Sequence, residues 1–394
     1  MDEFFFYNLC NYLVIVIFLL FFLKFKKINA LLFLILLLLA IAPFVMEKVY
    51  PSSSMYDIIV YYYLVDYFRD LQLWGGVVDQ ANVARQNLNI IAGDVPIKLD
   101  DYSFDPQLNA AAIMALVPIP FIVTAMSLGF TNKLIYIFTI VYLKNKKSLH
   151  DICLVIFLFY PSLIYYTSVG LKDTLVLCFS CLTLFFFINK RYFYFMIFFI
   201  LLVTVKWTNA LVFLFFVVYH KILFAGYSKI IKKFLIILMP LIAIIVIVLN
   251  IDLLLHALNY IRVNQWYADS PFLKPDTLEV NLNFIIELLN GYVRFFLSPS
   301  FNQISSPTQI FVLFENYLSI FIIAIVFIKS FKLNPYKAFF WLGMLMAFAS
   351  FYGITTINFG TINRWKLSIL LVYVFVSLHD CSFNEKQKKN SLYN

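Results

Sequence analysis

Seven charged residues beside long apolar runs are the side chains in this sequence best suited to chemistry. They are Lys172, Asp173, Lys206, Arg262, Arg294, Arg364 and Lys366. Charge at membrane depth is costly, so such residues usually face a cavity or a partner. Grouped cations bind anions, and arginine adds a planar fork that grips two oxygens at once. These five or six cations therefore predict a pocket for a phosphate or pyrophosphate group on a lipid carrier.

Each of these residues also has a simpler explanation, which the sequence leaves open. Lys172 and Asp173 would suit a self-satisfied pair at a helix start. Lys206 would suit a lysine that extends its ammonium to the lipid headgroups. Arg262 would suit a solvated loop, and Arg294 a headgroup anchor. Arg364 has the strongest functional interpretation, because it precedes the last apolar run.

A carboxylate or histidine is the other half of the predicted chemistry. Transfer of a sugar from a lipid diphosphate requires the acceptor hydroxyl to lose a proton to a nearby base. The candidates are Glu47, Asp57, Asp66, Asp70 and His256. Asp57 is preferred, because it follows the second apolar run, where a loop meets the membrane. For each acid, surface solvation is the alternative.

The elements that position these residues follow from composition. Of 394 residues, 63% are hydrophobic and 13% charged, which excludes a soluble domain, a disordered chain and a fibrous repeat. The apolar runs do not alternate, so a membrane β-barrel is excluded too. They fall at 4–23, 28–46, 110–143, 151–168, 174–188, 192–220, 234–250, 310–328, 338–354 and 367–379. The fold class is therefore all-α: residues 1–394 form one polytopic transmembrane bundle of about 11 spans.

Charge in the connecting segments predicts the topology. Short turns are basic, as at Lys24 to Lys27, Lys144 to Lys147 and Lys329 to Lys337, and the positive-inside rule assigns them to the cytoplasm. The long segments 47–109 and 251–309 then become two outer loops, with the N-terminus outside and the C-terminus inside. The run 192–220 divides at Lys206 into two short spans. The run 110–143 forms one span plus a re-entrant or interfacial helix, because prolines interrupt it.

Other signals are absent. The formal net charge of +9 is explained by the basic turns and does not indicate nucleic acid. Cys178 and Cys181 form a C-x-x-C pair within an apolar run, which favours structural thiols. No phosphate-binding glycine loop, dinucleotide fingerprint or metal-ligand spacing occurs, so we expect no cofactor and no metal. Most aromatic residues are typical of a membrane-interface belt; Tyr61 belongs to an outer group able to stack on sugar rings.

Several segments together resemble bacterial polysaccharide polymerases of the Wzy kind, which make O-antigen or capsule, and related membrane glycosyltransferases of the GT-C class. Residues 159–173 resemble the family pattern P-S-x-x-x-x-x-S-x-x-x-K/R-D, ending at Lys172 and Asp173. Lys206 stands where the family places a basic residue, with Lys-Trp instead of Arg-Pro. Residues 296–300 and 309–315 resemble the stretch before the next span. Residues 358–366, with Asn363 and Arg364, resemble N-x-G-x-x-x-R-Y-R, and Asp57 with Tyr61 matches D-x-x-x-Y.

The resemblance implies metal-independent polymerisation of undecaprenyl-diphosphate-linked oligosaccharide at the periplasmic face of the inner membrane. Asp57 and Arg364 would be catalytic. Lys172, Lys206, Arg262, Arg294 and Arg364 would hold the diphosphate, while Asp173, Tyr61 and Asn363 would make other substrate contacts. The bilayer and a chain-length regulator would be the further partners. Alternatives are a GT-C transferase of single sugars, an O-antigen ligase, a lipid-linked oligosaccharide flippase and a membrane scaffold.

Overall fold

The protein folds into two compact units in the computed structural model, Met1–Ala210 (unit 1) and Leu211–Asn394 (unit 2). The structure describes residues 3–49, 56–70, 106–224, 277–279, 282–299, 307–356 and 359–392, with single positions at 238, at 304 and between 252 and 263. These residues form helices and connecting turns but no strand. Most of the predicted outer loops and the predicted run 234–250 lie outside the described residues.

Six helical segments among the described residues are long and apolar enough to cross a bilayer. They are Phe5–Lys24, Ala30–Lys48, Tyr192–Phe224, Gln309–Leu333, Pro335–Thr355 and Gly360–Ser382. The chain therefore has the architecture of a helical, multi-pass membrane protein, as the composition predicts. The figure of about 11 spans stays a prediction.

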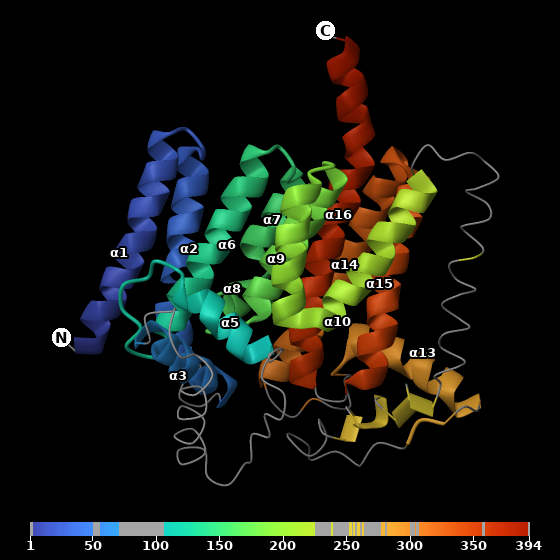
Figure 1. The fold of residues 1–394 in the computed structure, drawn as a ribbon, viewed down its shortest axis with the longest axis horizontal. Coiled ribbons are helices and arrows are strands. Elements are labelled where there is room, and N and C mark those ends of the chain that lie inside the picture. Colours follow the sequence, from blue (N-terminus) through green and yellow to red (C-terminus); the bar gives the residue numbers. More distant parts are fainter. Residues whose placement is uncertain are drawn as a thin grey trace. The chain divides into compact units, whose positions relative to one another are not determined.

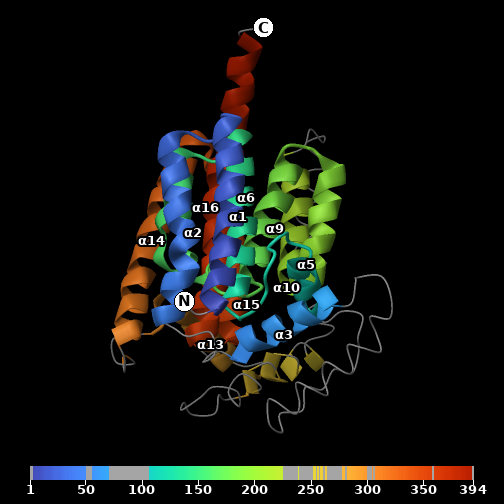
Figure 2. The same cartoon turned by 90° about the vertical axis from the view of Figure 1, so that its left-hand side faces the viewer.

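Unit 1 is a group of helices whose basic turns lie at one end (Figure 1). Its elements are α1 (Glu3–Lys24), α2 (Ala30–Val49), α3 (Tyr56–Asp70), α5 (Pro106–Ala115), α6 (Ser127–Asn145), α7 (Asp151–Phe159), α8 (Pro161–Tyr166), α9 (Asp173–Ile188) and the first part of α10 (Tyr192–Phe224). α1, α2 and α6 pack side by side, and α3 crosses the end opposite the basic turns (Figure 2).

Proline divides the predicted run 151–168 into two short helices, α7 and α8. Tyr160 separates them with an extended backbone (φ −70°, ψ 121°). A residue before proline avoids the helical region, because the proline ring crowds it. Pro161 then begins α8, where its missing N–H removes no helical hydrogen bond.

Polar side chains hold the broken segment 116–126, which lies between α5 and α6. Asn11 of α1 donates to the Phe121 carbonyl at 2.6 Å and accepts from the Phe121 N–H at 3.0 Å. Arg69 of α3 donates to the carbonyls of Val117 and Ile119 at 2.9 and 2.6 Å. Burial lowers the pKa of Arg69, an effect that the charge of Asp66 opposes. Non-helical backbone at membrane depth needs such hydrogen-bond partners. The predicted interruption of the run 110–143 is therefore present, and side chains of α1 and α3 stabilise it.

Unit 2 is built on three long consecutive helices. α14 (Pro307–Leu333), α15 (Pro335–Thr355) and α16 (Phe359–Leu392) are joined by short turns and pack against one another. α14 and α16 therefore begin at the same end, where α15 finishes. The amphipathic helix α13 (Leu282–Leu297) runs across that end (Figure 1). The opposite end carries the turn between α14 and α15 and the C-terminal part of α16.

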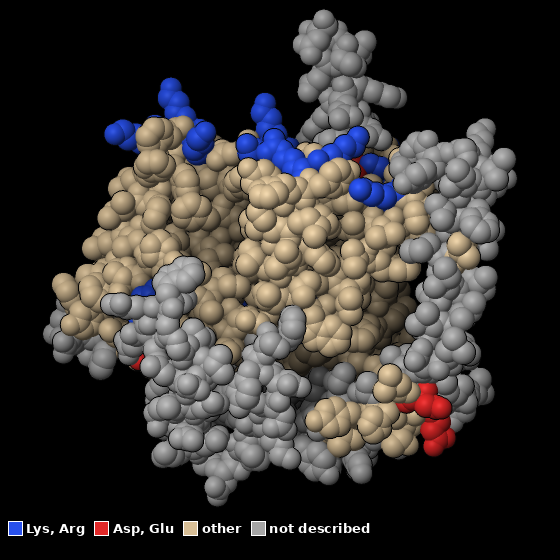
Figure 3. Space-filling model, in the orientation of Figure 1, with Lys and Arg blue, Asp and Glu red and all other residues tan. Residues whose placement is uncertain are grey.

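The long helix α10 breaks at Lys206, as predicted. There the backbone leaves the helical region (φ −155°, ψ 75°), and two helical segments meet at a kink. Basic side chains show the expected distribution along the helices. On the face drawn in Figure 3, the described lysines and arginines of each unit gather mostly at the end of that unit that carries its basic turns, and the flanks beside them are almost uncharged. This is the charge asymmetry typical of membrane proteins.

Candidate functional site

Two glycines bring α13 into backbone contact with the end of α15. A Cβ atom added to Gly353 of α15 would overlap the carbonyl of Gly291 in α13, and one added to Gly291 would meet the Gly353 backbone. Small residues permit such close helix crossings in membrane proteins. The contact brings Arg294, almost one turn beyond Gly291, to the Gly353 carbonyl, to which its Nη1 donates at 3.2 Å. α13 is thereby fixed across the end of unit 2.

Glu287 joins two of the predicted diphosphate-binding arginines. Its Oε2 accepts from Nη2 of Arg262 at 3.5 Å and from Nη2 of Arg294 at 3.4 Å. The Arg262 side chain is 4% exposed, whereas those of Arg294 and Glu287 are 22% and 27% exposed. We call these three residues the Glu287 site. The structure thus brings Arg262 and Arg294 together, with a carboxylate between them.

A buried lysine ties α16 to α14 at the same end of unit 2. Nζ of Lys366 donates to Oδ1 of Asn363 at 2.9 Å and to Oδ1 of Asn316. Asn316 in turn donates to the Ser298 carbonyl at 2.7 Å, just beyond α13. Glu315, the residue directly before Asn316 in α14, is buried. These residues, the Lys366 cluster (Lys366, Asn363, Asn316 and Glu315), lie about two turns into α14 and α16.

The Lys366 cluster contains one predicted site residue and holds another in place. Asn363, predicted as a substrate contact, is buried against Lys366. Arg364 follows it in the second turn of α16 and is half-buried. Because Lys366 joins α16, α14 and the segment after α13, it fixes the helix that carries Arg364 relative to the helix that carries Arg294.

In unit 1, α6 supports the segment that leads to Lys172 and Asp173. Asn132 donates to the carbonyls of Val169 and Leu171 at 2.5 and 2.8 Å. Lys133, fully buried, donates to the Thr167 hydroxyl at 2.7 Å and to the Ile164 carbonyl at 3.3 Å. The segment therefore has its carbonyls bound by a neighbouring helix.

Lys172 and Asp173 themselves lie at the start of α9. Lys172 is the half-buried residue before the helix, and Asp173 is its first residue and is buried. A carboxylate at a helix N-terminus is stabilised by the helix dipole. This placement suits both the predicted substrate contact and the simpler helix-start pair.

The remaining predicted residues of unit 1 are dispersed. Lys206, half-buried, occupies the kink of α10. Tyr61 of α3 is 1% exposed, so its ring is covered by the protein and offers no open face to a sugar. Asp57 lies in the first turn of α3, and its side chain lies outside the described residues. Its assignment as the base therefore stays a prediction.

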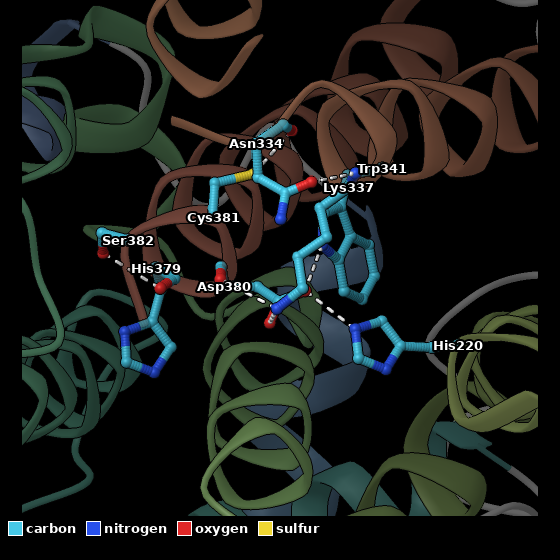
Figure 4. Close-up of polar contacts among 8 residues, drawn as sticks. All are labelled: His220, Asn334, Lys337, Trp341, His379, Asp380, Cys381 and Ser382. Atoms are coloured by element: carbon cyan, nitrogen blue, oxygen red, sulfur yellow. Dashed lines mark hydrogen bonds and ion pairs between the residues drawn. The ribbon is translucent and has the colours of Figure 1, made fainter. Parts of the chain in front are cut away.

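A second ionic cluster lies at the opposite end of unit 2 (Figure 4). Asp380 of α16 accepts from Nζ of Lys337 at 2.7 Å, from Nε2 of His220 at 2.8 Å and from Nε1 of Trp341 at 3.0 Å. The Asp380 side chain is 2% exposed. These four residues, the Asp380 cluster, tie α10, α15 and α16 together. Lys337 was predicted only as part of a basic turn, but its ammonium is a buried partner of the Asp380 carboxylate.

The sequence alone predicts no role for Lys133, Glu287, Glu315, Asn316 or Asp380. It predicts Lys337 only as part of a basic turn and Lys366 only as one of the outer cations. A usable signal existed for Lys133 and Glu315, since each is a lone ionisable residue inside an apolar run. Among the described residues, no group of three or more His, Cys, Asp or Glu side chains is arranged to hold a metal ion.

Comparison with known proteins adds no relative. No protein family, curated protein or solved structure matches this chain.

Proposed function

We propose that this chain is a membrane glycosyltransferase that polymerises undecaprenyl-diphosphate-linked oligosaccharide units at the outer face of a bacterial inner membrane. One observation carries the proposal. At the end of unit 2 opposite the basic turns, Arg262 and Arg294 converge on one carboxylate, and the Lys366 cluster anchors the helix that bears Arg364. Cations at that end oppose the positive-inside bias, so a function other than topology accounts for them best.

The orientation supports the substrate class. Lys329 and Lys332 end α14, and Lys386, Lys388 and Lys389 follow the last span. Positive-inside topology assigns that end of unit 2 to the cytoplasm. The Glu287 site then faces the periplasm, where a lipid-linked oligosaccharide would present its diphosphate at headgroup depth.

Glycosyl transfer from a lipid diphosphate requires stabilisation of the leaving group and removal of a proton from the acceptor. Departure of the lipid diphosphate from the sugar develops negative charge, which fixed guanidinium groups stabilise without reorganisation. We assign Arg262, Arg294 and Arg364 to this role, with Lys172 and Lys206 as further diphosphate contacts. The acceptor hydroxyl must lose a proton, and Asp57 is the proposed base. A chain-length regulator in the same membrane is the proposed protein partner.

The test is the glycan ladder of cells in which variant genes replace the deleted native gene. We expect Arg364→Ala to abolish long chains while the protein stays in the membrane at normal abundance. Arg364→Lys keeps the charge but loses the two-pronged fork, so it should give a partial ladder. Lys389→Ala, on the C-terminal tail, is the control and should leave the ladder unchanged.

Each result of the deletion discriminates between functions. Surface lipid capped by single repeat units indicates a lost polymerase. Complete absence of surface glycan would point instead to a flippase, and a normal ladder from Arg364→Ala would refute the phosphate role of that residue.

A further inference from the structure

The Glu287 site has the geometry of an anion site that its own protein has filled. Two guanidinium groups from separate segments converge on one oxygen, Oε2 of Glu287, at 3.5 and 3.4 Å. Charge-assisted bonds between arginine and a carboxylate are commonly about 2.7–2.9 Å and often use both oxygens. Glu287 is therefore held loosely, by a pair of donors that suits a larger anion.

We propose that Glu287 occupies, in the ligand-free protein, the position of a substrate phosphate between Arg262 and Arg294, and that the arriving phosphate displaces it. The carboxylate thus acts as an internal competitor that neutralises part of the site while it is empty. This inference rests on the proposed function for the identity of the substrate, a lipid-linked diphosphate.

Burial gives the site a direction. The Arg262 side chain is 4% exposed, whereas the Glu287 side chain is 27% exposed. Solvent therefore reaches the Glu287 carboxylate more readily than the Arg262 guanidinium. Displacement needs only a rotation of the Glu287 side chain, because the contact between Gly291 and Gly353 fixes the backbone of α13. Rotations of partly exposed side chains are fast compared with catalysis.

Charge favours the exchange. Within the Glu287 site, one carboxylate oxygen accepts from two guanidinium groups. A phosphate group supplies about two negative charges and three acceptor oxygens, so it matches the arginine pair better than a single carboxylate does. A buried pair of guanidinium groups with no anion would be costly, since like charges would then be desolvated together. Glu287 removes that cost between turnovers.

Inorganic pyrophosphate is the probe, and its affinity for the purified full-length chain in detergent is the measurement, by titration calorimetry. Glu287→Gln keeps the shape of the side chain and removes its charge, so we expect pyrophosphate to bind roughly tenfold more tightly. Glu279→Gln changes an exposed carboxylate just before α13 and is the matched control, expected to leave the affinity unchanged. Arg294→Ala should weaken binding in both backgrounds.

Unchanged or weaker binding by a folded Glu287→Gln protein would overturn the proposal, because Glu287 would then be a structural partner of the arginines. If that variant does not fold, Glu287→Asp replaces it. The shorter side chain withdraws the carboxylate while keeping its charge, so tighter pyrophosphate binding supports the proposal and weaker or equal binding overturns it.

The inference and the proposed function fail separately. Tighter pyrophosphate binding by Glu287→Gln, together with an unchanged glycan ladder in cells that lack the gene, would keep the anion site and reject the polymerase. A ladder lost on deletion of the gene, with unchanged pyrophosphate affinity of Glu287→Gln, would do the reverse.

Discussion

The two ends of unit 2 both bury ionic side chains, but they do so in different ways. At the end with the basic turns, Asp380 receives three donors at 2.7–3.0 Å, from Lys337, His220 and Trp341. The carboxylate is 2% exposed, and the Lys337 ammonium lies 2.7 Å from one of its oxygens. Both carboxylate oxygens of Asp380 accept hydrogen bonds from these side chains.

At the other end, one carboxylate oxygen serves two guanidinium groups at 3.4 and 3.5 Å. The Glu287 side chain is 27% exposed. Short distances and burial are typical of a structural ion pair. The longer distances and partial exposure of the Glu287 site fit our proposal that an anion replaces its carboxylate. We therefore propose that one end contributes stability and that the other binds an anion.

The largest effect on stability should come from Asp380→Ala. The change leaves the Lys337 ammonium buried without its carboxylate, which we expect to cost about 3–5 kcal/mol of unfolding free energy. The measurement is thermal unfolding of the purified protein in detergent.

The double variant Asp380→Leu with Lys337→Met removes both charges and should recover much of that loss. Equal stability of Asp380→Ala and the native protein would show that the Asp380 cluster does not stabilise the fold. It would also contradict the distinction between the two ends of unit 2.

A smaller loss of stability, with a large loss of activity, should follow Gly353→Ala. The added methyl group overlaps the Gly291 carbonyl, so α13 must shift, at a cost of about 1–3 kcal/mol. Because Arg294 lies on α13, the shift also moves Arg294 away from its position beside Glu287. We therefore expect the glycan ladder to shorten or vanish.

Gly343→Ala lies on the same helix and is the matched control, because nothing lies within 4 Å of its added Cβ. It should keep the full ladder and unfold at the same or a slightly higher temperature. A full ladder from Gly353→Ala would show that the position of α13 does not matter for activity.

The smallest effect should come from Lys332→Ala. Lys332 is exposed near the end of α14, whereas Lys337, across the same short turn, is buried against Asp380. We expect a change in unfolding free energy of less than about 0.5 kcal/mol for Lys332→Ala and a loss close to that of Asp380→Ala for Lys337→Ala. Similar denaturation curves for the two lysine variants would contradict the distinction.

The features predictable from the sequence were local. Apolar runs and basic turns predicted the membrane-protein class, and the breaks at Lys206 and in residues 116–126 lie where charge or proline interrupts a run. Pro161 also breaks a helix inside the run 151–168, although the continuous hydrophobicity of this run predicts a single span.

The site was predictable only as a list of unusual cations. Asp380 and Lys337 are 43 positions apart, and Lys366 and Asn316 are 50 apart, so no spacing rule joins them. Glu287 looked like one acid in a polar loop, because its role depends on α13 crossing α15 at Gly291 and Gly353. Pairings of this kind arise from tertiary packing. Hydrophobic periodicity in a single sequence indicates local secondary structure, but it does not show which distant residues meet.

The contact between Asn11 and Phe121 has a consequence for the order in which the protein is made. Asn11 lies in the first membrane helix, and its backbone partner is 110 residues away. At ribosomal speeds of about 5–20 residues per second, α1 must wait on the order of ten seconds for that partner. Its buried amide must meanwhile be satisfied by water, lipid headgroups or the insertion machinery. α1 therefore reaches its final place only after the segment 116–126 has been synthesised.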